Sequence, residues 1–349
     1  MSRNLAYLAY RRSTAAVFGG VLIMSAASSG YAQSPLLIAP EAIQWKPASI
    51  FEKDVKGAEL EDQPRMNLSG AACVPTTPKF TSCLIANDEK KYAQFFSING
   101  NTLTPQKLIR LSDADKDPAS EGVAYDKGFF YVTGSHGRSR KKDNDNDSSY
   151  FVFRFAVDPA TGIPKFEPSE KEVIGVQSSP RLREEIREGD HVGAFFNKPL
   201  ADGGVNIEGI AVKDGWMHLG LRGPSQNGNA FVLSVDAEAV FTKDDPLKGR
   251  VTPLVLGQNT GIRDLAALND GILILAGPTR KEIVPYTVWF WDGVATTAKL
   301  LATLDLSGVD ESAKAEILLP LEDDSSGVRV LVMFDGLENG GAMSFKIPR

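Results

Sequence analysis

Histidine is scarce in the 349-residue sequence, which contains only His136, His191 and His218. No two of them have the short spacing of a zinc site, so the common zinc-ligand motifs are excluded. The chain also lacks a P-loop, a G-x-G-x-x-G loop and a G-x-S-x-G nucleophile motif. It has many glycines and prolines, 32 and 20, together with 42% hydrophobic residues. This composition is typical of a globular protein with many turns.

A membrane-length apolar run is also missing. The apolar run at residues 15–27 is shorter than the roughly 20 residues of a membrane span. It follows Arg3, Arg11 and Arg12 and precedes the small residues Gly30 and Ala32. We interpret residues 1–32 as a cleaved export signal of the general or twin-arginine type, with an uncleaved anchor as the alternative. The predicted location is periplasmic or secreted, with no membrane span in the mature chain.

Positive charge is not in excess. The formal net charge is −6, and loss of the three signal arginines would make the mature chain more acidic. Such a chain is not expected to bind nucleic acid or an anionic membrane. We expect a monomer whose partner is either a small anionic ligand or another protein.

Only two cysteines occur, Cys73 and Cys83, and both belong to the mature chain. They bound the nearly symmetric segment "CVPTTPKFTSC", which places them opposite each other across a hairpin. Because an exported chain meets an oxidising compartment, we predict a disulfide between them.

One short pattern recurs along the chain, as in "SEGVAY" (120–125) and "NIEGIAV" (206–212). The position held by Glu121 and Glu208 in these two stretches is here called the frame position, and its residue the frame residue. A short apolar strand follows it. The frame residues are Ser69, Glu121, Glu208, Arg263 and Glu316, separated by 52, 87, 55 and 53 residues. A turn rich in Gly, Asn and Asp follows, and then further β-rich segments.

Four short antiparallel strands repeated at about 50 residues are typical of a β-propeller. We predict an all-β protein, with residues 33–349 forming one propeller of five four-stranded blades; six blades are the alternative. A pair of β-sandwiches and a β-helix fit the regular spacing less well. We interpret the surplus segment 178–199 as an inserted helix and loop. We also expect a strand from residues 42–55 to complete the last blade.

The motifs together resemble a known family. They are "EGVAYDKGFFYVTGSHGR", "NIEGIAVKDGWMHLGLRGPS", "GIRDLAALNDGILILAGPT" and "VLVMFDG". In this order they are similar to the bacterial domain-of-unknown-function family numbered 3616, over most of residues 66–349. The resemblance implies a bacterial propeller and supplies no activity or catalytic residue. The frame is also distantly similar to phytase-like esterase and lactonase propellers, a likeness of fold only.

In a propeller, the first strand of each blade lines a central channel, and the second strand ends at the same mouth. We therefore expect the frame residues and the ends of the second strands to gather at one mouth. The candidate residues are Ser69, Asp88, Glu121, His136, Glu208, Arg222, Arg263, Asp264, Glu316 and Asp335.

The three frame glutamates need positive charge nearby. Two carboxylates about 6 Å apart at an effective dielectric constant of 20 repel by roughly 3 kcal/mol. The counter-ion is either Ca²⁺ or another divalent cation bound by Glu121, Glu208 and Glu316, or Arg263 in a structural ring. A bound metal would favour hydrolysis of an anionic ester or lactone. The alternative is a non-catalytic propeller that binds a ligand or a protein, and the sequence leaves the choice open.

Overall fold

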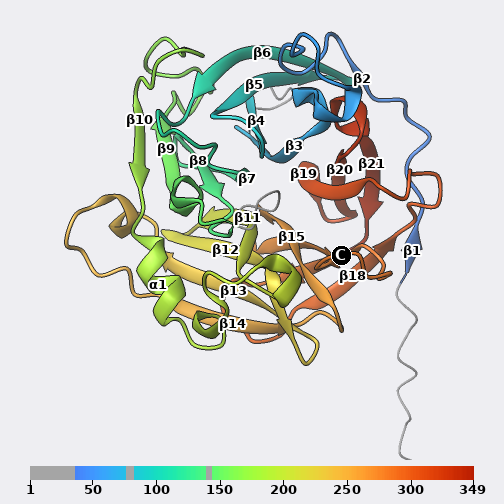
Figure 1. Ribbon diagram of the computed structural model, residues 1–349. Helices are drawn as coiled ribbons and strands as arrows, with labels where there is room; N and C mark the ends of the chain where they lie inside the picture. Colours follow the sequence, from blue (N-terminus) through green and yellow to red (C-terminus); the bar gives the residue numbers. More distant parts are fainter. Residues whose placement is uncertain (1–35, 76–81, 139–143) are drawn as a thin grey trace, which may run out of the picture. The chain divides into compact units, whose positions relative to one another are not determined.

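The computed structural model describes residues 36–75, 82–138 and 144–349; the predicted export signal, residues 1–32, lies outside them. Contacts divide the chain into Met1–Ser34 and a second unit, Pro35–Arg349. The strands of the second unit form five small sheets arranged around a centre (Figure 1). This confirms the five-bladed β-propeller and excludes six blades. No helix in the described ranges is long and apolar enough to cross a bilayer.

Each blade consists of antiparallel strands that follow one another in the chain, from the channel outward. The first blade contains β3 (Leu68–Cys73), β4 (Cys83–Asn87), β5 (Tyr92–Asn99) and β6 (Thr102–Arg110). The second contains β7 (Ser120–Asp126), β8 (Phe129–Gly134), β9 (Val152–Ala156) and β10 (Val176–Ser179). The third contains β11 (Asn206–Lys213), β12 (Trp216–Gln226), β13 (Asn229–Asp236) and β14 (Arg250–Val255). The fourth contains β15 (Thr260–Ala267), β16 (Ile272–Pro278), β17 (Thr287–Trp291) and β18 (Lys299–Leu304). The fifth contains β19 (Lys314–Asp324), β20 (Gly327–Asp335) and β21 (Met343–Ile347).

The expected closure of the last blade by an N-terminal strand is wrong. The fifth sheet keeps three strands, whereas β1 (Leu37–Ile38) pairs in parallel with β18 and β2 (Lys46–Pro47) pairs in parallel with β6. Between them the chain passes the last blade with one backbone hydrogen bond, from Glu41 N to Ser344 O at 2.8 Å. The N-terminal segment thus contacts three blades. It forms two short strand pairings, with β18 and β6, in place of the one longer pairing expected with the last blade.

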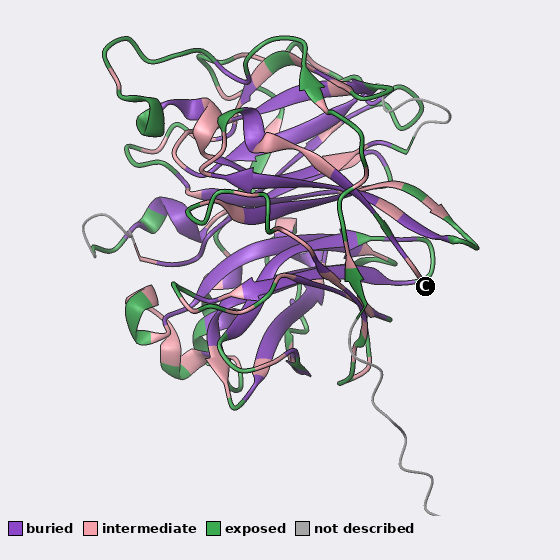
Figure 2. Ribbon diagram, turned by 90° about the vertical axis from the view of Figure 1, so that its right-hand side faces the viewer, coloured by how far each residue is buried: buried purple, intermediate pink, exposed green. Residues whose placement is uncertain are grey.

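The core lies between neighbouring blades rather than on one face of a sheet. Buried residues run through the inner strands, and exposed residues gather in loops and at the periphery (Figure 2). Because β11 has blades on both sides, seven of its eight residues are buried. The short helix α1 (Leu182–Glu188) buries Leu182 and Ile186 in the cluster formed by the second and third blades. It lies within the segment predicted as an insertion.

Seven short 3₁₀ segments occur in the described residues, and one of them, η4, lies within the segment expected as an insertion. They are η1 (Leu60–Asp62), η2 (Pro64–Met66), η3 (Asp147–Tyr150), η4 (Gly193–Phe195), η5 (Leu200–Asp202), η6 (Ala239–Phe241) and η7 (Glu338–Gly341). Of these, η5 matters for the site because it begins the approach to β11.

The predicted disulfide between Cys73 and Cys83 is confirmed. The two residues are register partners at the end of β3 and the start of β4. Ser69 lies near the other end of β3 and pairs with Ala86, so the bridge lies at the end of the strand pair that is farther from the frame residue. A loop this short is expected to contribute about 2–3 kcal/mol to stability.

Candidate functional site

A β-bulge interrupts the pairing of each inner strand at the frame. The residue left without a register partner is Gly70, Glu121, Glu208, Arg263 or Glu316 in the five successive blades. In the first blade, the bulged residue is thus Gly70 and not Ser69. Bulges re-aim side chains, and here they accompany side chains that meet at the channel axis. The sequence repeat therefore encodes a repeated backbone irregularity.

The glycines that follow Glu121 and Glu208 are required by the closeness of the inner strands. A Cβ at position 122 would lie 2.7 Å from Glu208 O, and one at position 209 would lie 2.8 Å from Leu265 N. These atoms belong to the backbone of the next blade and cannot move aside easily. The crowding expected from the sequence is present.

The frame side chains form one buried chain of contacts, here called the channel network. Glu208 accepts a hydrogen bond from Arg222 Nη1 at 2.7 Å through Oε1, and its Oε2 lies 3.0 Å from Arg263 Nε. Arg263 continues the chain by donating from Nη2 to Glu316 Oε1. One arginine thus joins carboxylates from the third and fifth blades.

Ser69 completes the channel network. Its Oγ lies 3.2 Å from Glu121 Oε2 and 3.3 Å from Glu316 Oε2, so its single proton can serve either carboxylate. All five frame residues, which span the chain, therefore meet at the axis. All are at least 97% buried.

Burial and charge act in opposite directions on the protonation of Arg263. Burial alone would lower the pKa of its guanidinium, but the nearby charges of Glu208 and Glu316 together raise that pKa above its usual value. The group therefore stays charged. With Arg222 it provides two positive charges against the three glutamates, so the network is nearly balanced.

Asp264 lies beside this network and not in the open mouth. Its side chain is buried and accepts backbone hydrogen bonds from Leu265 N at 2.8 Å and Leu318 N at 2.7 Å. Burial, assisted by the charges of Glu208 and Glu316, raises its pKa well above the ordinary value. Its position ties the fourth blade to the fifth, which is a structural role.

The divalent-cation site expected at Glu121, Glu208 and Glu316 stays a prediction. Glu208 and Glu316 both contact Arg263, and a cation bound between them would lie against a guanidinium. Across residues 36–75, 82–138 and 144–349, no group of three or more His, Cys, Asp or Glu residues is arranged to hold a metal ion. Among the contacts of the described residues, Arg263 is the cation that lies against both Glu208 and Glu316.

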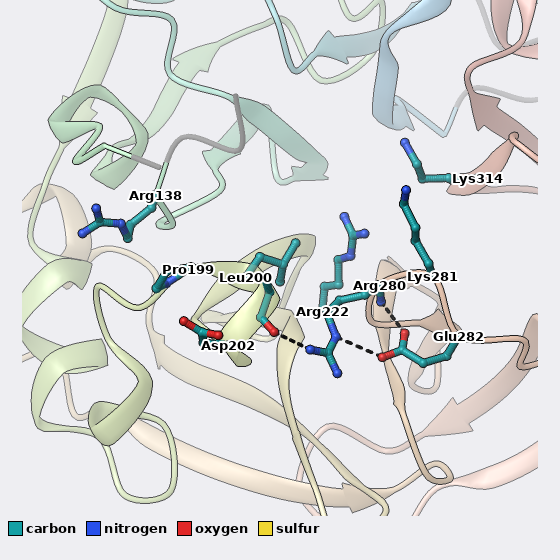
Figure 3. Close-up of a pocket in the computed structure, with 10 residues that line it drawn as sticks. Arg138, Pro199, Leu200, Asp202, Arg222, Arg280, Lys281, Glu282 and Lys314 are labelled. Atoms are coloured by element: carbon teal, nitrogen blue, oxygen red, sulfur yellow. Dashed lines mark hydrogen bonds and ion pairs between the residues drawn. The ribbon is translucent and has the colours of Figure 1, made fainter. Parts of the chain in front are cut away.

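Two cavities open at the mouth above the network. The mouth cavity has a volume of about 820 Å³, and Asp88, Glu121 and Asp335 line it as expected. The neighbouring basic groove has a volume of about 900 Å³ (Figure 3). Its lining residues are Arg138, Pro199, Leu200, Ala201, Asp202, Arg222, Arg280, Lys281, Glu282 and Lys314. Arg138 and Lys314 line both cavities.

Not every predicted residue reaches the mouth. His136 is fully buried and lines neither cavity; its ring packs edge-on against Tyr150, with the centroids 6.1 Å apart. Neither ring nitrogen has a hydrogen-bond partner in the part of the chain that is described. Burial lowers its pKa to about 3. Its backbone φ is positive, at 50°, and its buried ring does not line the mouth cavity or the basic groove.

The sequence interpretation missed most of the basic groove. Arg280 and Lys281 directly follow β16, and Lys314 begins β19. The rule that second strands end at the mouth pointed to Pro278 and Thr279, just before this pair. Extending that rule by two residues would have found Arg280 and Lys281.

One family model matches most of the chain. The family model described as "Protein of unknown function (DUF3616)" matches residues 80–153 and 167–342. The chain belongs to this family. No curated protein matches the sequence.

The chain is similar to several solved structures at low sequence identity. The exo-β-1,3-galactanase from Phanerochaete chrysosporium has 12% identity and a TM-score of 0.45 over 86% of this chain and 63% of its own. The chain thus spans less than two thirds of that protein. A glycosyl hydrolase from Bacteroides ovatus has 10% identity and a TM-score of 0.41 over 80% of this chain and 84% of its own. The PQQ-bound aldose sugar dehydrogenase from Streptomyces coelicolor has 10% identity and a TM-score of 0.38 over 86% and 97%.

Proposed function

We propose that the protein binds a small anionic ligand in the basic groove at the channel mouth. The carrying observation is the lining of that groove, which has five basic and two acidic side chains. Four of the basic side chains form ion pairs, with Asp145, Glu208, Glu282 and Asp335. A concave site with convergent cations attracts and orients anions. The confirmed disulfide supports a location in an oxidising compartment, in the periplasm or outside the cell.

The arginines of the groove are held in place before any ligand arrives. Arg222 donates from Nε to Thr279 O at 2.6 Å and from Nη1 to the buried Glu208. Arg280 donates from Nε to Glu282 Oε1 at 3.0 Å and from Nη1 to Ala201 O. Fixed side chains lose little entropy on binding, which favours affinity. Lys281 has no ion-pair partner among the described residues, so its charge is open to a ligand.

Binding of simple anions tests this proposal. Calorimetry with phosphate, sulfate and hexanoate should detect binding of at least one anion, with affinity falling as ionic strength rises. Lys281→Ala should raise the Kd about fivefold to tenfold, because it removes one cation from the groove. The exposed Lys299 on β18 lies outside the groove, so Lys299→Ala is the matched control and should leave Kd unchanged. Absence of binding by all three anions at millimolar concentration would rule the proposal out.

Hydrolysis of a bound anionic ester or lactone is the second candidate function. It is favoured by carboxylates in the mouth cavity, which adjoins the basic groove through Arg138 and Lys314. Glu121 is the one frame glutamate that lines this cavity. Its carboxylate is placed to act as a general base on a water that attacks a carbonyl or phosphoryl group.

A panel of lactones and of carboxylate- or phosphate-bearing esters tests hydrolysis. Glu121→Gln should lower kcat at least about a hundredfold, as expected for loss of a general base. Glu59 is exposed and lines neither cavity, so Glu59→Gln is the control and should retain activity. A rate that depends on added Ca²⁺ and is lost with a chelator would support the metal-assisted form. No turnover of any substrate by the wild type would leave a non-catalytic binding protein.

A further inference from the structure

We propose that the ligand of the basic groove is an amphiphilic anion, with one anionic head group on an aliphatic or aromatic body. This rests on the proposed anion-binding function and narrows its ligand class. The groove is lined on one part by cations and on another by apolar side chains from a different segment of the chain. Such a division matches a ligand that has both kinds of surface.

The apolar wall comes from Pro199, Leu200 and Ala201, around the start of η5. Leu200 lies close to Gly223, the residue after Arg222 in β12. Its Cδ1 is 3.2 Å from the position that a Cβ of Gly223 would take. Figure 3 shows Leu200 beside Arg222. Leu200 and Pro199 are only partly buried, so a ligand can cover them further. Covering such surface is favourable only if the ligand brings apolar atoms.

The cationic wall is joined to the apolar wall by a direct contact. Arg280 Nη1 donates to Ala201 O (Figure 3), so the guanidinium and the residue after Leu200 lie within one hydrogen bond of each other. A ligand body on Leu200 would therefore hold its head group within reach of Arg222, Arg280 or Lys281. The two walls act on one molecule and not on two separate ones.

The volume of the groove also favours an amphiphilic ligand over a small inorganic anion. Its volume of about 900 Å³ falls in the range of pockets for drug-sized ligands, about 300–1,000 Å³. A bare phosphate or sulfate would occupy only a small part of it and would leave the apolar wall in contact with water. A ligand with a longer body fills the groove and contacts both walls.

A homologous series of carboxylates separates these cases on the wild-type protein. Calorimetry with acetate, butanoate, hexanoate and octanoate should show affinity rising about fourfold per added methylene until the apolar wall is covered. Gluconate, which has the chain length of hexanoate but carries hydroxyl groups, should bind no better than acetate. Octanoate binding is measured far below its micelle-forming concentration.

Two variants locate the effect. Leu200→Asn should weaken octanoate at least tenfold and reduce the ratio of octanoate to acetate affinity, whereas Lys281→Ala should weaken every member of the series by a similar factor. Ile163 is 64% exposed and lies outside the groove, so Ile163→Asn serves as the control and should reproduce the wild-type series.

The outcomes are distinguishable from those of the anion-binding proposal. Equal affinities along the wild-type series overturn the amphiphilic ligand but leave anion binding intact. Gluconate binding more tightly than hexanoate overturns it in favour of a hydroxylated anion. Absence of binding by every carboxylate, phosphate and sulfate overturns both proposals. Because the series is measured on the wild type, a variant that fails to fold does not prevent a decision.

Discussion

Replacing Arg263 with methionine should lower the free energy of unfolding by about 3–5 kcal/mol, as expected when one partner of a buried ion pair is removed. The guanidinium is fully buried and contacts Glu208 and Glu316. Without it, Glu316 keeps a neighbouring hydroxyl, that of Ser69, but loses the cation that contacts it. Urea unfolding followed by circular dichroism measures the change, with an unaltered slope showing that only stability has changed.

Removing an opposing charge should restore part of this loss. Glu208 still contacts Arg222 when Arg263 is removed, so Glu316 is the carboxylate to neutralise. Adding Glu316→Gln to Arg263→Met removes a buried negative charge that has lost its arginine, so the double variant should be more stable than Arg263→Met alone. Arg187 provides the control because its ion pairs with Glu184 and Glu188 are exposed. Arg187→Met should cost less than about 1 kcal/mol.

The same samples decide between the arginine and a metal as counter-ion. If Arg263→Met is no more harmful than Arg187→Met, Arg263 is not the cation that neutralises the channel network. A rise in the wild-type melting temperature on adding Ca²⁺, abolished by Glu208→Gln, would then assign that role to a divalent cation.

The sequence predicted the fold and the channel network because both depend on a repeat. The spacing of the frame residues fixes the inner strand of each blade, and ring closure brings residues as distant as Ser69 and Glu316 together. The prediction that an N-terminal strand completes the last blade was wrong because β1 and β2 are only two residues long. So short a strand has no hydrophobic pattern that selects one sheet edge over another.

The basic groove and the position of His136 could not be predicted in the same way. The groove combines η5, which follows the inserted segment, with the loop after β16. Nothing in either segment specifies the other; only the packing of the third and fourth blades places Leu200 beside Arg222 and Arg280. For His136, the ring is fully buried and packs against Tyr150, and the position of a residue after the end of a strand does not specify such burial.

The closeness of the inner strands gives the second large expected effect. Gly122→Ala should destabilise the fold by about 3 kcal/mol, at the upper end of what overpacking usually costs. A Cβ at this position would lie 2.7 Å from Glu208 O and 2.9 Å from Ile210 N, and relieving these clashes requires the second and third blades to separate. The bulges that aim Glu121 and Glu208 at the axis lie in the strands that would move.

Gly308→Ala is the matched control for this substitution. Nothing lies within 4 Å of a Cβ at position 308 and its backbone has no positive φ, so the change should stay within about 0.5 kcal/mol. Both variants are compared by urea unfolding, and the distortion should also lower anion affinity in Gly122→Ala, because Glu208 holds Arg222 in the basic groove. Equal stability of the two variants would mean that the inner strands can accommodate a Cβ at position 122. The channel network would then tolerate a wider ring.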